Sequence, residues 1–197
     1  MKLINKLLLI LILIFNFQAL TKADDISEFE IEGISIGDSL LDYFSKAEIK
    51  DMYLVVYPKS QKYIKLGFRG NNKFDDYEDL TFHVKKNDKR YVIHTINGVI
   101  YYENKFEKCM KKKKEVVKNL SSTLKSIEPY EYEYEYPGDD AGSIAHISDF
   151  EFSDGSSIRV WCVNWTASVE RNKNYGDSLS ISMAPKYFFD WLNNEAY

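Results

Sequence analysis

Residues 104–127, NKFEKCMKKKKEVVKNLSSTLKSI, decide the fold, because they form one long helical pattern between two strand-rich regions. Apolar residues recur along this stretch at helical spacing, namely Phe106, Cys109, Val116, Val117, Leu120, Leu124 and Ile127. Asn104 followed by Glu107 resembles a capping box and predicts the helix start. Pro129 predicts its end, because the residue before a proline avoids the α region. The sequence therefore predicts one long helix with one apolar face.

Short apolar runs broken by turn residues lie on both sides of this helix. Strands are predicted over 52–57, 63–68, 80–86, 89–95, 99–102, 147–152, 158–165 and 179–183. A first helix is expected from Asp38, and Pro185 opens a short closing helix. Tight turns between neighbouring strands imply an antiparallel sheet. We therefore expect an α+β domain with one long central helix and shorter N- and C-terminal helices, divisible into two helix-plus-three-strand halves.

Two hairpins allow the register of their strands to be predicted. A two-residue turn at Asn87-Asp88 would pair His83 with Val92 and make His83 and His94 diagonal neighbours on one face. The hairpin of 147–152 and 158–165 needs an odd, three-residue connection instead, with Gly155 in the left-handed conformation. Only that register puts the apolar residues of both strands on one face.

Four residues are candidates for ligand binding. Trp161 and Trp165 project from the face opposite to Cys162, either as part of a second covered core or as an open aromatic platform. His83 and His94 belong either to a plain solvated face or to a metal or anion site. Because no third ligand accompanies the two histidines, we predict no metal.

Tyr and Glu alternate without exception from residue 130 to 136. Such a run can be an edge strand whose row of like charges resists pairing with another chain. It can also be a tyrosine platform beside an acidic row, suited to a sugar or a cationic ligand. A mobile exposed loop is the third alternative, and the sequence leaves all three open.

The first 23 residues have the pattern of a cleavable secretory signal peptide. Lys2 and Lys6 precede an apolar run over 7–15, and Thr21 and Ala23 put small residues before a cleavage site. The run is shorter than the roughly 20 residues of a membrane span, although an uncleaved anchor is the alternative. We expect a single domain over 24–197 that is periplasmic or secreted. Cleavage would remove three Lys and no acidic residue, and would change the formal net charge from −4 to −7. An acidic mature chain argues against a nucleic-acid partner.

The chain contains two cysteines, Cys109 and Cys162. Exported proteins meet an oxidising environment, and no other cysteine competes, so we predict a disulfide between them. Cys109 lies on the apolar side of the long helix, and Cys162 shares a strand face with apolar neighbours under the three-residue turn. Two buried free thiols are the alternative.

Two segments carry a resemblance to a known group of proteins. Phe29-Glu-Ile-Glu-Gly-Ile-Ser-Ile-Gly-Asp-Ser-Leu-Leu-Asp-Tyr-Phe-Ser45 and Phe189-Asp-Trp-Leu-Asn-Asn-Glu-Ala-Tyr197 resemble an uncharacterised family of small exported proteins from marine alphaproteobacteria. The resemblance runs along the expected mature chain and implies a periplasmic setting, but no activity. The stretch 33–41 is also similar to the helix-opening segment of small outer-membrane assembly lipoproteins, whose lipidated cysteine this chain lacks.

Several function classes have no support in the sequence. It contains no glycine-rich phosphate loop, no nucleophile elbow and no metalloprotease helix motif, so we expect no cofactor. A binding or envelope-accessory module, with a small molecule or an envelope protein as partner, is the preferred hypothesis. The alternative is a periplasmic hydrolase that uses paired carboxylates, because such pairs cannot be seen in a sequence.

Overall fold

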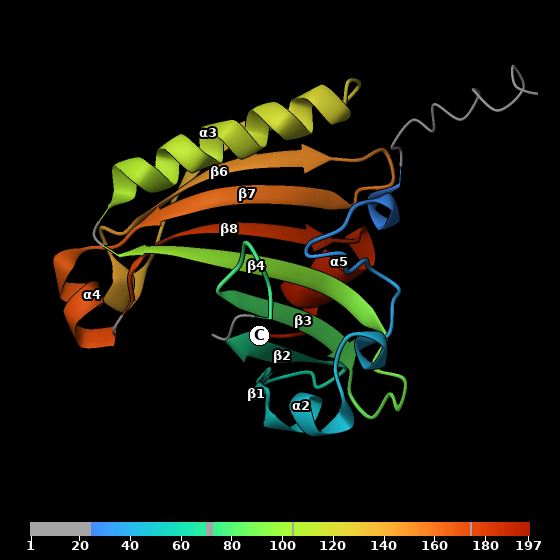
Figure 1. The fold of residues 1–197 in the computed structure, drawn as a ribbon. Helices are drawn as coiled ribbons and strands as arrows, with labels where there is room; N and C mark the ends of the chain where they lie inside the picture. Colours follow the sequence, from blue (N-terminus) through green and yellow to red (C-terminus); the bar gives the residue numbers. More distant parts are fainter. Residues whose placement is uncertain (1–24, 70–72, 104, 174) are drawn as a thin grey trace, which may run out of the picture.

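A single eight-stranded antiparallel sheet organises the chain (Figure 1). The computed structural model describes residues 25–69, 73–103, 105–173 and 175–197. The strands are β1 Tyr53–Val56, β2 Tyr63–Arg69, β3 Asp79–Lys85, β4 Ile93–Glu103, β5 Tyr130–Glu135, β6 Ile144–Glu151, β7 Ser157–Asn164 and β8 Asp177–Ala184. The α-helices are α2 Lys46–Asp51, α3 Phe106–Thr123, α4 Ala167–Lys173 and α5 Lys186–Asn194, and the 3-10 turns are η1 Ile26–Glu28, η2 Leu40–Asp42 and η3 Gly138–Asp140. The expected α+β class is confirmed.

The strand order β1-β2-β3-β4-β8-β7-β6-β5 divides the sheet into two meanders of four strands. They join where β4 pairs with β8, and a helix precedes each meander. The expected halves of three strands were therefore one strand short. In the second half the Tyr/Glu run supplies the extra strand, β5, which pairs with β6. In the first half five runs were expected, and the two around Gly98 form one continuous strand, β4, which leaves four strands.

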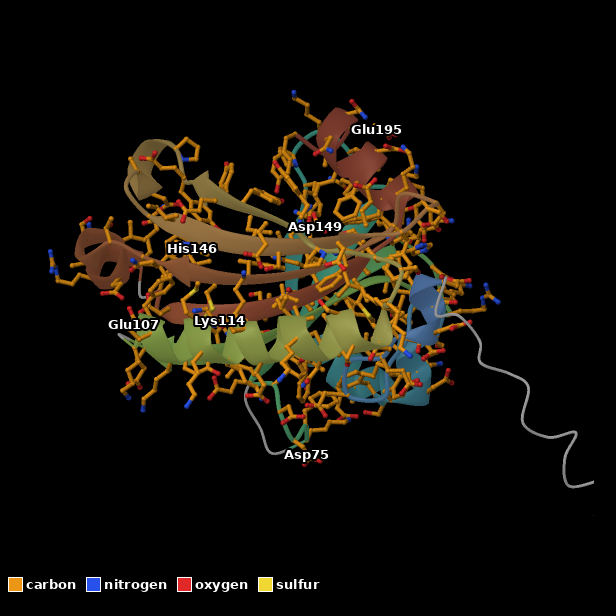
Figure 2. All side chains as sticks on the ribbon, turned by 90° about the horizontal axis from the view of Figure 1, so that it is seen from above. Asp75, Glu107, Lys114, His146, Asp149 and Glu195 are labelled. Atoms are coloured by element: carbon orange, nitrogen blue, oxygen red, sulfur yellow. A yellow bond between two sulfur atoms is a disulfide. The ribbon has the colours of Figure 1, made fainter. Side chains whose placement is uncertain are left out.

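Helix α3 covers one face of the sheet and contacts β4, β7 and β8. A disulfide joins Cys109 of α3 to Cys162 of β7, with the Cα atoms 6.0 Å apart, and both cysteines are fully buried. In Figure 2, Lys114 is labelled on this helix and His146 is labelled on β6. The ring centroid of His146 lies 5.2 Å from that of Phe106, which begins α3. The predicted disulfide is confirmed. The proposed capping residue Asn104 lies outside the described residues.

The β6–β7 hairpin has the predicted register. Phe150 pairs with Ile158, and the Phe152 N–H donates to the Ser156 carbonyl across a three-residue connection. Gly155 has a φ of +78°, the left-handed conformation that the bulged turn requires. Phe150, Ile158, Val160 and Cys162 consequently belong to the core beneath α3.

The β3–β4 hairpin does not have the predicted register. His83 pairs with Thr95 rather than with Val92, and a register shift follows at Val84. The connection is longer than two residues, because the Asp88 carboxylate accepts from the Arg90 and Val92 amides and holds this segment as a loop. Side-chain bonding of this kind competes with continuation of the strands.

The N-terminal segment differs from the single helix expected at Asp38. Ser39 caps the short turn η2, and Ser45 forms a capping box with Glu48 at the start of α2. Asp38 instead accepts hydrogen bonds from the Ser35 amide and the Tyr43 hydroxyl. The predicted signal peptide lies outside the described residues, and no described helix is long and apolar enough to cross a membrane.

Candidate functional site

A groove of about 580 Å³ lies on the face of the sheet opposite α3. We call it the open-face groove. Its lining residues are the aromatic Tyr53, Tyr101, Tyr136, Trp161, Trp165 and Tyr175, the polar Thr81, Asn97, Ser178 and Ser180, the charged Lys65, Arg69, Asp79 and Lys173, and Val99, Val163 and Gly176. Its volume falls in the range of about 300 to 1,000 Å³ that is usual for small-molecule sites.

Strand pairing explains why these residues share one surface. Successive residues of a strand point to opposite faces, and directly paired residues point to the same face. Asp79 pairs with Val99, Val99 with Ser180, and Ser180 with Trp161, so one row crosses four strands. The alternate residues of β8, Leu179, Ile181 and Met183, belong to the core beneath α3. The groove is thus the polar side of strands whose apolar side is buried.

The floor of the groove carries polar groups with no partner inside the protein. Thr81, Ser178 and Ser180 are only 6%, 8% and 5% exposed, and their hydroxyls make no hydrogen bond to another described residue. The Asn97 side-chain oxygen is buried and likewise unpaired. Buried polar atoms in proteins are almost always bonded, so the unpaired Asn97 oxygen needs an explanation. The hydroxyls of Thr81, Ser178 and Ser180 face the groove, where solvent or a ligand can bond to them, whereas the Asn97 oxygen lies beneath its surface.

Aromatic rings form the wall of the groove beside α4. The ring centroid of Trp165 lies 4.8 Å from Tyr136 and 4.9 Å from Tyr175. Trp161 packs with a small cluster containing Ala145, Ile147 and Val163. Both indoles are half-buried, so they are neither deep core residues nor a fully open platform. The structure brings the two predicted tryptophans together in the lining of one groove.

The opposite wall is built around Asp79. Its carboxylate is 3% exposed and accepts from Arg69 Nε at 3.0 Å and from the hydroxyls of Tyr53 and Tyr101 at 3.2 Å. Tyr53 reaches it by lying over Gly67, where a Cβ atom would come within 1.9 Å of the tyrosine ring. Burial, with the nearby Asp79 charge, raises the pKa of Tyr53. Asp79 therefore stabilises this wall by accepting hydrogen bonds from Arg69, Tyr53 and Tyr101.

Lys65 is the one groove cation without an acidic partner. Arg69 pairs with Asp79, and Lys173 lies 2.6 Å from Asp140, but no described carboxylate lies within 4.0 Å of the Lys65 amine. Burial lowers the pKa of Lys65, and the attraction of Asp79 offsets part of this effect. A half-buried, unpaired ammonium is costly unless an anion accompanies it.

His83 and His94 lie on the same side of the sheet but do not line the groove. Helix α5 covers them: the His83 ring lies 4.5 Å from that of Phe188, and His94 Nδ1 lies 2.7 Å from the Tyr187 hydroxyl. His83 also bonds the hydroxyls of Tyr57 (2.6 Å) and Thr95 (2.5 Å), and burial lowers its pKa to about 3. No group of three or more metal-ligating side chains occurs in the described part of the chain. The structure therefore gives the histidines a packing role.

Two other features of the molecule have some properties of a binding or catalytic site. A hollow of about 380 Å³ lies under α3, and its lining includes core residues such as Leu179 and Ile181. Lys113 donates to the Ser148 hydroxyl at 2.5 Å, a pairing that can serve as a nucleophile with its base. Ser148 is fully buried and bonds Glu131, so no substrate can reach this hydroxyl.

Comparison of the chain with family models, with curated proteins and with solved structures gives no significant match.

Sequence reasoning found the two tryptophans and missed the rest of the groove. The available signal was the alternation of Ser178, Ser180 and Ser182 with apolar residues, which marks a strand with one polar face. Lys65 alternates with Ile64 and Leu66 in the same way, but its place in a groove with Asn97 and the serines of β8 depends on pairing between distant strands.

Proposed function

We propose that this chain is an exported, periplasmic or secreted binding protein whose ligand site is the open-face groove. The observation that carries the proposal is the groove floor, where the hydroxyls of Thr81 and Ser180 lie between aromatic residues and make no hydrogen bond to another described side chain. Aromatic side chains beside a few well-placed polar groups are typical of ligand sites, and the wall with Trp165 and Tyr175 lies beside this floor. The disulfide supports export, because disulfides persist in oxidising compartments.

The groove favours a ligand with both ring faces and hydroxyl groups, that is, a saccharide. Trp161 and Trp165 offer flat apolar surfaces on which the C–H face of a sugar ring can lie. The hydroxyls and the amide of the floor can donate to and accept from sugar hydroxyls. A purely apolar ligand would leave these floor groups unbonded, at a cost of about 1–3 kcal/mol each.

A hydrolase using paired carboxylates receives no support from this groove. A pair of carboxyl groups must flank the bond that is cut. Asp79 is the only carboxylate that lines the groove among the described residues, and it is bonded to Arg69 and two tyrosines. Binding without chemistry is the function that the groove supports.

Isothermal titration of the purified protein with a panel of short neutral and acidic oligosaccharides tests the proposal. We expect measurable binding of at least one member, and a loss of at least about tenfold in Trp161→Ala, because truncating an aromatic anchor commonly costs more than about 2 kcal/mol. Tyr130→Ala is the matched control, since Tyr130 is exposed and outside the groove. No binding of any panel member by the folded protein, or equal losses in both variants, would overturn the proposal.

A further inference from the structure

We infer that the open-face groove takes an acidic oligosaccharide, whose anionic group binds the Lys65 ammonium while its sugar rings lie against Trp161 and Trp165. This inference rests on the proposed function and adds to it the charge and the length of the ligand. The inference depends on Lys65, Trp161 and Trp165, which line one groove but lie at its opposite ends.

The charge of the groove differs in sign from that of the chain. Three cations and one carboxylate line the groove, whereas the whole chain has a formal net charge of −4. A cleft lined by one sign of charge raises the local concentration of ligands of the opposite sign. The groove therefore selects anions in a protein whose remaining surface repels them.

Lys65 supplies the specific contact. Arg69 and Lys173 are occupied by Asp79 and Asp140, so Lys65 is the groove cation that a carboxylate or sulfate on the ligand can pair with directly. Its neighbour across the strands, His83, bonds two hydroxyls and lies under α5, and so does not compete for the anion. Pairing with an anion compensates the burial of the ammonium, and hydrogen bonds to charged groups are stronger than neutral ones.

The distance between the two ends sets the length of the ligand. Strands β2 and β7 are separated by β3, β4 and β8, and four spacings of about 4.8 Å place their backbones about 19 Å apart. One sugar ring cannot touch both Lys65 and the indoles. A chain of several sugars can, and its middle units would lie over Thr81, Asn97 and Ser180, which offer hydrogen bonds along the way.

Matched pairs of oligosaccharides test the inference. Each acidic probe is a uronic acid oligosaccharide of two to five units, and its neutral partner is the same chain with the carboxyl groups reduced to alcohols. Both are titrated into the full-length protein and into Lys65→Gln, Lys65→Arg and Lys89→Gln. Lys89 is an exposed lysine of the β3–β4 connection and serves as the control for a lost positive charge.

We expect the unmodified protein to prefer the acidic chain by at least about tenfold, as a hydrogen bond to a charged group is worth about 1.5–3 kcal/mol. Lys65→Gln should lose this preference, because its affinity for the acidic chain falls by at least about tenfold while its affinity for the neutral chain falls much less. Lys65→Arg should keep most of the preference, and Lys89→Gln all of it. The preference should also weaken at 0.5 M salt.

The possible failures are distinguishable. Equal binding of acidic and neutral chains by the unmodified protein would overturn the inference and leave the saccharide site standing. No binding of either chain would overturn both. If Lys65→Gln does not fold, as judged by circular dichroism, the ratio of affinities in the unmodified protein and its salt dependence decide the question.

Discussion

Asn97 lies in the middle of β4, and its side-chain oxygen is buried without a partner among the described residues. A group of this kind lowers stability by about 1–3 kcal/mol. Sites that bind ligands commonly carry such a cost, because the groups that recognise a ligand are not satisfied by the fold itself. The neighbouring hydroxyls of Thr81 and Ser180 belong to the same floor.

Asn97→Val should therefore raise the free energy of unfolding by about 1 kcal/mol and weaken saccharide binding. Valine suits a strand, and it removes the unpaired oxygen. Denaturant unfolding and titration calorimetry measure the two effects. Asn164→Val, at the exposed end of β7, should change neither by a comparable amount. A destabilised Asn97→Val variant would show that the side chain serves packing rather than recognition.

His83 illustrates the opposite case, a polar side chain fully used by the fold. Tyr57 and Thr95 bond its two ring nitrogens, and burial lowers its pKa from 6.5 to about 3. The unfolded chain therefore binds a proton between pH 6.5 and about pH 3 that the folded chain does not bind. Stability contributed by neutral His83 is complete above pH 6.5 and is lost as the pH falls through this window.

Unfolding measured from pH 7 to pH 5 should show stability falling with a slope of up to about 1.4 kcal/mol per pH unit from this one residue. His83→Gln removes the titrating group, so its stability should depend less steeply on pH, with all other groups unchanged. Parallel pH profiles for the two proteins would contradict the assignment of His83 as a buried neutral base.

At the scale of elements, β5 shows that one sequence pattern can form a single strand while its residues have different roles. The run over 130–136 forms the edge strand β5, which is the first of the three alternatives. Glu131 and Glu133 are largely exposed and can keep another chain from pairing with this edge. Tyr136, just beyond the strand, is the member of the run that joins the groove lining.

The disulfide is the covalent link between α3 and the sheet. It closes a chain separation of 53 residues, for which loss of unfolded-state entropy predicts about 4 kcal/mol of stabilisation. The double variant Cys109→Ala, Cys162→Ala should therefore lose about this amount in denaturant unfolding. The unmodified protein in the presence of a reductant should show a similar loss. A loss below about 1 kcal/mol in both experiments would show that packing of α3 does not depend on the link.

At the scale of the whole molecule, local patterns in the sequence predicted the parts whose partners are near in the chain. The long helix, the closing helix and the β6–β7 turn at Gly155 each follow from residues within one short stretch. The β3–β4 register was wrong because Asp88 holds a loop through its own backbone contacts, which the turn pattern at Asn87-Asp88 did not reveal.

The groove could not be predicted for a different reason. Its floor depends on the pairing of β4 with β8, for example Val99 with Ser180, which brings together residues far apart in the chain. Nothing local in either strand specifies that pairing. The tryptophans were found because Trp161 and Trp165 are an even number of residues apart in one predicted strand and an odd number from Cys162, and the hydroxyls opposite them were not.

Nuclear magnetic resonance of the three indole N–H groups tests the ligand site most directly. Trp161 and Trp165 line the groove, whereas Trp191 is a buried residue of α5 whose N–H donates to the Ser60 hydroxyl, so the chain contains its own control. During titration with a pool of neutral and acidic tri- and tetrasaccharides, the signals of Trp161 and Trp165 should shift while that of Trp191 stays in place. Shifts confined to Trp191, or no shift at saturating concentration, would contradict a saccharide site in this groove.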